Sequence, residues 1–421
     1  MIHQPVHCNL TDPGEFKIKV LSWLKQFNIF CFLDNCGYSS PVGFRCFIAA
    51  GAQRLIQPEN FSALQQQLLP NTWWFGHLNF EFSSGISSTK PEYTGFPEAC
   101  FFEPEILIEL NGNTAIVHYG TDDAEALVAS ILQTPVEEDP WHPATGFQQA
   151  ISREEYLQQV SEVLKHIQRG DCYELNFCQA FTAHTSVHPV QLYKQLMQAS
   201  PNPFAALYRL ADAWCLCASP ERFLLRQEQL LCSEPIKGTA PRGQAPEEDQ
   251  AQADALFHSQ KDRSENVMVV DLVRNDLSRV CVAGSVKVPA LYEIRTFPGV
   301  HQMVSTVCGT VKPDVSTAQI LEATFPMGSM TGAPKHRVLE LTRQYEAQQR
   351  GLFSGCIGYC TPGGDFDFNV VIRSLFLQPQ NGTVAFLAGG GITHNSVPEL
   401  EYEESILKTR AIRNILGLRV R

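Results

Sequence analysis

Residues 233–243 read Ser233-Glu234-Pro235-Ile236-Lys237-Gly238-Thr239-Ala240-Pro241-Arg242-Gly243, and the other motifs of the chain lie on either side of this stretch. Its lysine, Lys237, follows an apolar, strand-like run and enters a turn bounded by glycine and proline. A lysine in such a turn can attack carbon when burial or nearby cations lower the pKa of its ammonium group. An ordinary lysine in a surface loop is the alternative interpretation of the same residues.

The composition is that of an ordinary globular protein. The chain has 421 residues, of which 44% are hydrophobic, enough for one large domain or two to three smaller ones. The 32 basic and 44 acidic residues give a formal net charge of -12, which disfavours nucleic acid as a partner. An anionic substrate must therefore meet local cations, a metal ion or backbone N–H groups.

The sequence also bears on the cellular compartment. No basic N-terminal region leads into an apolar stretch, and no apolar run is long enough to cross a bilayer, so we expect a soluble, cytoplasmic protein without a membrane partner. The 14 cysteines are scattered through apolar segments, which predicts mostly buried free thiols. Zinc is not expected at Cys215-x-Cys217 or at Cys356-xxx-Cys360, because both pairs lie in strand-like runs without paired Cys/His clusters.

A polar, proline-rich segment at residues 135–146 predicts a boundary between two regions, 1–145 and 146–421. The first region alternates short apolar runs with Gly, Pro and Asn, which is typical of strands with intervening helices. The second opens with a capping box, Ser152-x-x-Glu155, and the helix that follows should stop at Gly170.

Strands are predicted next. Residues 173–178 alternate so that Glu174 and Asn176 share one face. Two more strand-like runs, 204–210 and 213–218, lead to Ser-Pro-Glu at residues 219–221.

Glu221 ends an apolar run, where desolvation can keep its carboxyl group protonated near pH 7 and able to donate to a departing hydroxyl. The alternative is a helix-capping glutamate or one paired with Arg222. Farther along, residues 244–252 are polar and suit a mobile loop over an active site.

Four acidic residues point to a cation. Asp262 and Glu265 share one face of a helix that is too apolar to be fully exposed, and Glu401 and Glu404 repeat the spacing on a helix that Pro398 can start. Burying four carboxylates is costly without a cation between them. Magnesium fits, since it accepts few carboxylates and keeps several waters. Solvated acids on two amphipathic helices are the alternative.

Three further segments have the chemistry of ligand binding. Residues 325–335 bring glycines and hydroxyls to a helix N-terminus, which favours an anion unless this is a plain helix entry. The three glycines at 389–391 let backbone N–H groups approach a carboxylate, although a strand bulge uses the same residues. Arg373 can bind a carboxylate through two N–H groups of its planar guanidinium, and Tyr359 can add a hydrogen bond from its hydroxyl.

From about residue 147 to the end, these motifs resemble the chorismate-utilising enzymes, and they occur in the order of that family. Pro-Ile-Lys-Gly-Thr at residues 235–239 is the form found in the members that make aminodeoxychorismate. Anthranilate, isochorismate and salicylate synthases usually carry a small residue in place of Lys237. The resemblance implies an α+β fold, one large sandwich of antiparallel β-sheets flanked by helices, with the N-terminal region completing the layers.

The resemblance also implies roles for individual residues. Lys237 would form a covalent intermediate with the substrate, and Glu221 would be the general acid. Magnesium would be held directly by Glu265 and Glu404, with Asp262 and Glu401 acting mainly through water. Metal and cationic neighbours are expected to favour the neutral amine of Lys237. The implied substrate-binding residues are Thr239, Ser329, Thr331, Gly332, Tyr359, Arg373, Gly389, Gly390, Gly391 and Lys408.

The resemblance implies a transferase. It would convert chorismate and ammonia to 4-amino-4-deoxychorismate, a precursor of para-aminobenzoate and folate. The chain has no Gly-x-Cys-x-Gly segment of a glutaminase. Ammonia is therefore expected from a separate glutamine amidotransferase subunit, or from solution at high ammonium.

Two departures from the family leave alternatives. Glu174 stands where the water-adding members have lysine and many aminating members have glutamine. Gln302 stands where pyruvate-eliminating members have histidine, and His301 should point to the opposite face. The first alternative is anthranilate synthase component I, which Lys237 and Gln302 oppose, and the second is a catalytically silent chorismate-binding regulatory subunit.

Overall fold

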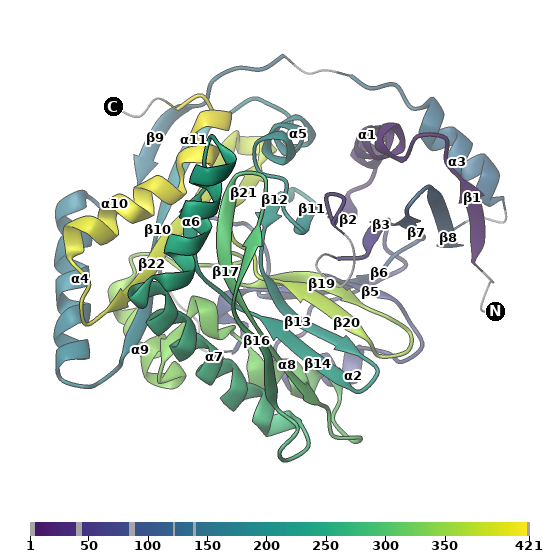
Figure 1. Cartoon of the computed structure of the whole chain (residues 1–421). Helices are drawn as coiled ribbons and strands as arrows, with labels where there is room; N and C mark the ends of the chain where they lie inside the picture. Colours follow the sequence, from purple (N-terminus) through teal and green to yellow (C-terminus); the bar gives the residue numbers. More distant parts are fainter. Residues whose placement is uncertain (1–4, 39–43, 84–88, 121–122, 138–139, 419–421) are drawn as a thin grey trace.

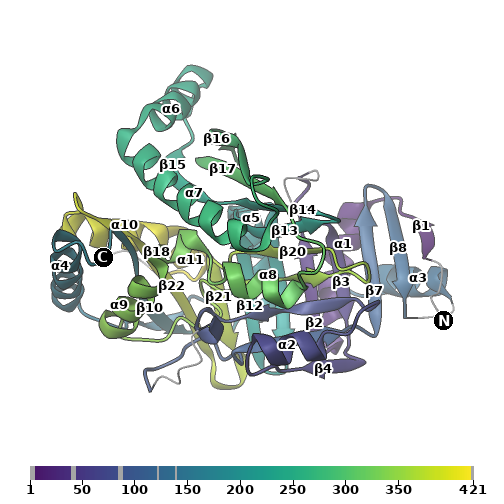
Figure 2. The same ribbon diagram turned by 90° about the horizontal axis from the view of Figure 1, so that it is seen from below.

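The computed structural model describes residues 5–38, 44–83, 89–120, 123–137 and 140–418. Two large antiparallel β-sheets lie face to face, and helices cover their outer faces (Figures 1 and 2). The predicted α+β sandwich is therefore confirmed. None of the helices in the described ranges is both long and apolar enough to span a membrane.

The first sheet contains twelve strands within the described residues. In spatial order they are β1 (Val6–Asn9), β8 (Thr114–Tyr119), β7 (Ile106–Asn111), β3 (Cys46–Ala50), β2 (Ile29–Asp34), β11 (Phe204–Leu210), β12 (Ala213–Ser219), β21 (Ser374–Gln378), β22 (Thr383–Thr393), β10 (Glu174–His184) and β18 (Gly332–Ala333), with β9 (Thr145–Gln149) also on β10.

The second sheet contains ten strands in the same part of the chain. Their order is β15 (Ile236–Pro241), β17 (Val300–Thr310), β14 (Leu230–Glu234), β13 (Arg222–Gln227), β20 (Phe366–Asn369), β19 (Cys356–Cys360), β5 (Trp74–Leu78), β6 (Ala99–Glu103) and β4 (Arg54–Ile56), with β16 (Lys287–Thr296) also on β17.

The helices are α1 (Pro13–Trp23), α2 (Phe61–Gln67), α3 (Ala124–Gln133), α4 (Arg153–Gln168), α5 (Pro189–Ala199), α6 (Pro246–His258), α7 (Gln260–Val280), α8 (Thr317–Thr324), α9 (Lys335–Tyr345), α10 (Pro398–Lys408) and α11 (Arg410–Ile415). The predicted capping box at Ser152 and Glu155 begins α4, and Pro398 begins α10. Both helix starts are therefore confirmed.

Strands from before and after residue 145 pair within each sheet. In the first sheet β2 pairs with β11, and in the second β5 pairs with β19. Strand β2 is apolar on both faces: Phe30 and Phe32 pack toward the outer helices, while Cys31 and Leu33 pack between the sheets. The N-terminal strands thus share one core with the strands that carry the later motifs.

The prediction of a mobile loop at residues 244–252 is wrong, because most of this segment lies in α6. Pro246 occupies the first turn, where its missing N–H costs nothing, and three acidic residues in that turn suit the helix N-terminus. Asp249 then accepts hydrogen bonds from Arg242 at 2.7 Å, which ties the helix to the residue that follows β15. Figure 2 shows α6 and α7 beside β15 and β17. A segment with a polar sequence therefore forms an ordered helix here, because it contacts other parts of the fold.

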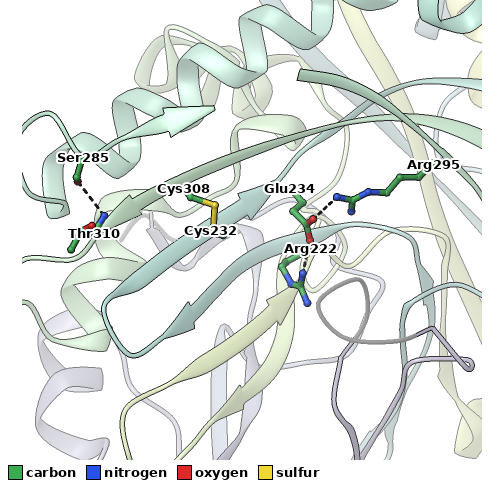
Figure 3. Close-up of a disulfide and its surroundings, with 7 residues drawn as sticks. All are labelled: Arg222, Cys232, Glu234, Ser285, Arg295, Cys308 and Thr310. Atoms are coloured by element: carbon green, nitrogen blue, oxygen red, sulfur yellow. Dashed lines mark hydrogen bonds and ion pairs between the residues drawn. A yellow bond between two sulfur atoms is a disulfide. The ribbon is translucent and has the colours of Figure 1, made fainter. Parts of the chain in front are cut away.

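One pair of cysteines forms a disulfide. Cys232 of β14 and Cys308 of β17 are direct cross-strand partners, and Figure 3 shows their sulfur atoms joined. The other twelve cysteines are free thiols, and all except Cys36 are buried, as predicted. The sequence could not single out this pair, because 76 residues separate the two cysteines and only the strand pairing makes them neighbours.

Candidate active site

Lys237 lies at an irregular position of β15, an edge strand of the second sheet. The pairing with β17 shifts between Ile236 and Thr239, and Gly238 in between has φ +93°, which glycine tolerates best. A Cβ at Gly238 would lie 3.0 Å from the side chain of Asp262, so this turn also needs a residue without a side chain. The Lys237 side chain is only 10% exposed. The alternative of a surface-loop lysine is therefore excluded.

The amine of Lys237 meets a buried carboxylate. Nζ donates a hydrogen bond of 2.5 Å to Oε1 of Glu174, the first residue of β10, which is 1% exposed. Strand β22 runs beside this pair, and a Cβ at Gly391 would lie 2.9 Å from Glu174 Oε1 and 3.1 Å from Lys237 Nζ. Gly391, one of the three glycines predicted to approach a carboxylate, therefore leaves the space that the Glu174 and Lys237 side chains occupy.

The expectation of cationic neighbours around Lys237 is wrong. Burial by itself would lower the pKa of Lys237, but Glu174, Glu265 and Glu221 outweigh it, so the pKa is raised. Without ligands the amine is therefore a charged ammonium group.

Glu221 lies in the turn between β12 and β13 and is 3% exposed. Desolvation raises the pKa of its carboxyl group to about 7, against the opposing effects of Ser329, the backbone at Ile236, Lys237 and Arg373. A carboxyl group with this pKa can donate a proton near neutral pH. The neighbouring Arg222 is engaged by Glu234 and Asp367, as Figure 3 shows for Glu234.

The segment 325–335 passes beside this acid. Ser329 is buried, its hydroxyl faces the Glu221 carboxyl group, whose pKa it lowers, and it lines a cavity of about 10 Å³ together with Glu221. Thr331 uses its hydroxyl internally, donating to the carbonyl of Met327 at 3.1 Å. Gly332 pairs with β10, where a Cβ would lie 2.0 Å from the carbonyl oxygen of Glu174. The structure therefore brings Ser329 to Glu221, while Gly332 allows the close approach of the two strands.

Arg373 also faces Glu221. Its backbone has φ +53°, which is uncommon for a residue with a side chain and is often kept at functional sites. Burial lowers the pKa of Arg373 to about 10, although Glu221 opposes this effect. Among the described residues its guanidinium forms no ion pair, so the charge is available to an anionic ligand.

Tyr359 occupies a different setting. Its ring lies 4.8 Å from that of Phe47 and 5.9 Å from that of Phe75, in the aromatic core between the sheets. No hydrogen bond or ion pair joins it to Arg373 in the part of the chain that the structure describes. Tyr359 packs in this core, and Thr239 on β15 is exposed.

The four predicted carboxylates lie around Lys261, whose pKa is raised, against the effect of burial, by Glu265, Glu401, Glu404 and Asp262. Glu401 is 3% exposed, so its interpretation as a solvated acid is excluded.

Two buried carboxylate oxygens in this group lack hydrogen-bond partners: Oε1 of Glu265 and Oε2 of Glu401. Desolvation raises the pKa of Glu265 to about 7, although Lys237 opposes this effect. Glu404 pairs with Lys408 at 2.8 Å, and Lys408 also donates to the carbonyl of Gly389. A Cβ at Gly390 would lie 3.4 Å from Glu401 Oε2 and 3.5 Å from Glu404 Oε1, so these oxygens gather over β22.

No three metal-ligating side chains within the described ranges lie close enough to form a complete metal site. Magnesium usually takes only one or two carboxylates and completes its coordination with water and substrate oxygens. The unpartnered oxygens therefore fit such an ion.

The departure from the family at residue 302 and the neighbouring His301 also have clear positions. Gln302 is 1% exposed and pairs with Thr239, with its amide oxygen unpartnered. His301 points to α6, with Nε2 2.8 Å from Asp249. As predicted, His301 does not take the place of the missing histidine.

A family model described as chorismate binding enzyme matches residues 44–414. The chain therefore belongs to the chorismate-binding enzyme family. It is 43% identical over 268 residues to aminodeoxychorismate synthase component 1 of Escherichia coli (strain K12), a match that covers 64% of this chain and 59% of that protein. It is 40% identical to the chloroplastic aminodeoxychorismate synthase of Arabidopsis thaliana, over 76% of this chain and 37% of that protein. The chain thus matches about three-fifths or less of the length of these relatives.

Solved structures share the fold. Anthranilate synthase component I from Streptococcus pneumoniae superposes with a TM-score of 0.77 at 26% identity, covering 89% of this chain and 93% of that one. The menaquinone-specific isochorismate synthase from Escherichia coli also gives 0.77, at 18% identity, covering 98% and 94%. The sandwich with its flanking helices is therefore the fold of this family.

Proposed function

We propose that the protein converts chorismate and ammonia to 4-amino-4-deoxychorismate. The observation that carries the proposal is a buried lysine, Lys237, beside a buried acid, Glu221, whose pKa is about 7. The names of the relatives support the same activity.

The proposed chemistry has two displacement steps. Lys237 first gives one proton to water, and its neutral amine then attacks C2 of chorismate while the C4 hydroxyl leaves as water with a proton from Glu221. Ammonia next forms a bond to C4, and the C2–N bond to Lys237 breaks as the ring double bonds shift back. The ammonium group formed at C4 then returns one proton to the Glu221 carboxylate, which restores the acid. Amination at C4 follows from this order of events.

Charged and polar groups around the pair would bind the substrate. Arg373, which forms no ion pair in the described part of the chain, would hold the enolpyruvyl carboxylate, and the buried hydroxyl of Ser329 would donate to a substrate oxygen. Magnesium would be held by Glu265 and Glu404, with Asp262 and Glu401 acting through water, and its charge would neutralise the ring carboxylate. The ammonia would come from a separate glutamine amidotransferase subunit in the cytoplasm, or from ammonium in solution.

Two observations count against the alternatives. The buried amide of Gln302 cannot take up a proton at neutral pH, so the elimination of pyruvate in anthranilate formation lacks its base. A silent regulatory subunit would not need to bury a lysine among three carboxylates, which costs desolvation energy.

The test is to incubate the purified protein with chorismate, magnesium and ammonium and to identify the product by chromatography and mass. We expect 4-amino-4-deoxychorismate. Anthranilate would favour the first alternative, and unchanged chorismate at high ammonium would favour the regulatory subunit.

We predict that Glu404→Gln weakens magnesium binding by at least about tenfold and raises the KM for chorismate, because a charge-balancing ligand is lost. The measurement is a magnesium titration of activity. Glu403→Gln is the matched control, since Glu403 lies on the same helix but is exposed. Normal magnesium dependence in Glu404→Gln would show that this ligand assignment is wrong.

We also predict that magnesium binds more tightly as the pH rises toward 7. The pKa of Glu265 is about 7, so below that pH the ion must displace a proton, and the apparent Kd should change by up to about tenfold per pH unit. Titrations between pH 6 and pH 8 measure this, and Glu265→Gln should abolish the dependence. Equal Kd values at pH 6 and pH 8 in the unaltered protein would contradict the prediction.

A further inference from the structure

We propose that Glu174 is a positioning residue for Lys237: its carboxylate holds Nζ by an accepted hydrogen bond, so that the amine is aimed at the substrate. This inference rests on the proposed function, because it concerns how the nucleophile of that reaction is oriented. It assigns a task to a residue that the two-step chemistry itself does not use.

Glu174 and Lys237 differ in how firmly their backbones are held. Glu174 lies in β10 between two partners, opposite Thr393 of β22 and Ala333 of β18. Lys237 lies on an edge strand, next to the irregular position at Gly238, and its long side chain has several rotatable bonds. The hydrogen bond of 2.5 Å therefore ties a mobile amine to a fixed support.

Burying Glu174 and Lys237 is not the most stable way to fill this part of the core. Both side chains are removed from water, and Oε2 of Glu174 is buried with no hydrogen-bond partner. A buried ion pair is often no more stabilising than apolar residues of the same volume, and an unpartnered buried oxygen adds a further penalty. The arrangement is therefore better explained by the orientation of the amine than by stability.

The neighbouring strand also accommodates this geometry. Gly391 leaves room for both polar atoms, since a methyl group there would lie 2.9 Å from Glu174 Oε1 and 3.1 Å from Lys237 Nζ. A neutral amine that donates one N–H to Glu174 keeps its lone pair for carbon. An amide oxygen can accept the same bond, so the task needs an acceptor at this place but not a negative charge.

The experiment compares Glu174→Gln with Glu174→Leu in steady-state amination of chorismate, with folding followed by thermal unfolding. We expect Glu174→Gln to keep kcat within about tenfold of the unaltered protein. Glu174→Leu should lower kcat by about 10²-fold, the scale of a misplaced reacting group, with little change in the KM for chorismate. A proton acceptor would instead be lost in both variants, and a large fall of kcat in Glu174→Gln would overturn the proposal.

A second variant leaves both charges in place. Gly391→Ala should push the pair apart and lower kcat, whereas Gly363→Ala is the control, because a Cβ there would meet only Thr361 Oγ1 at 3.7 Å. Normal kcat in Glu174→Leu, or in Gly391→Ala if Glu174→Leu does not fold, would also overturn the proposal. If the unaltered protein makes no C4 amine, the proposed function fails. If it does, and these variants match it, only the role of Glu174 fails.

Discussion

Lys237→Ala is expected to abolish most formation of 4-amino-4-deoxychorismate, because the variant has no amine to attack C2. Any residual amination should move to C2, where external ammonia can then attack directly. The measurement is product analysis by chromatography and mass at high ammonium. Lys165→Ala is the control, since that lysine is 62% exposed and lies in a surface ion pair.

The same step predicts a covalent intermediate. Incubating the unaltered protein with chorismate and magnesium, but without ammonia, should add the mass of chorismate minus water to the peptide that contains Lys237. The alanine variant should show no such addition. If Lys237→Ala made the C4 amine at the normal rate, covalent catalysis by this lysine would be ruled out.

Glu221→Gln is expected to lower turnover by roughly 10²–10⁴-fold, the usual scale for a general acid, because glutamine cannot donate a proton to the departing hydroxyl. The reaction needs the protonated acid, whose pKa is about 7, so kcat of the unaltered protein should fall as the pH rises above that value. Kinetics between pH 6 and pH 9 measure both effects, and Glu154→Gln on the exposed start of α4 is the control.

Stability gives an independent check on Glu221. Its pKa in the folded protein lies above the ordinary value of 4.5, so the folded state holds this proton more tightly, and ionisation of the group disfavours folding as the pH rises through this range. Glu221→Gln should therefore be at least as stable as the unaltered protein at pH 8. Normal turnover in Glu221→Gln would show that Glu221 has only a structural role.

The sequence alone determined those features that depend on neighbouring residues. The capping box at Ser152 and Glu155 and the proline at 398 predicted two helix starts correctly, because caps and first-turn prolines act within a few residues. The Lys237 segment and the Glu221 motif were recognised as short runs in a fixed order. The family resemblance then supplied the sandwich, which periodicity could not establish.

Only the tertiary structure decided what lies next to these groups. Glu174 and Lys237 are 63 residues apart, and the meeting of β10 with β15 makes them a buried pair and raises the pKa of the lysine, contrary to the sequence-based expectation. The ordered helix α6, the cross-strand disulfide and the position of Tyr359 in the aromatic core likewise depend on contacts between distant segments. Burial and electrostatic interaction are properties of the folded surroundings, so the residues that can carry the chemistry were visible in the sequence, whereas their charge states and partners were not.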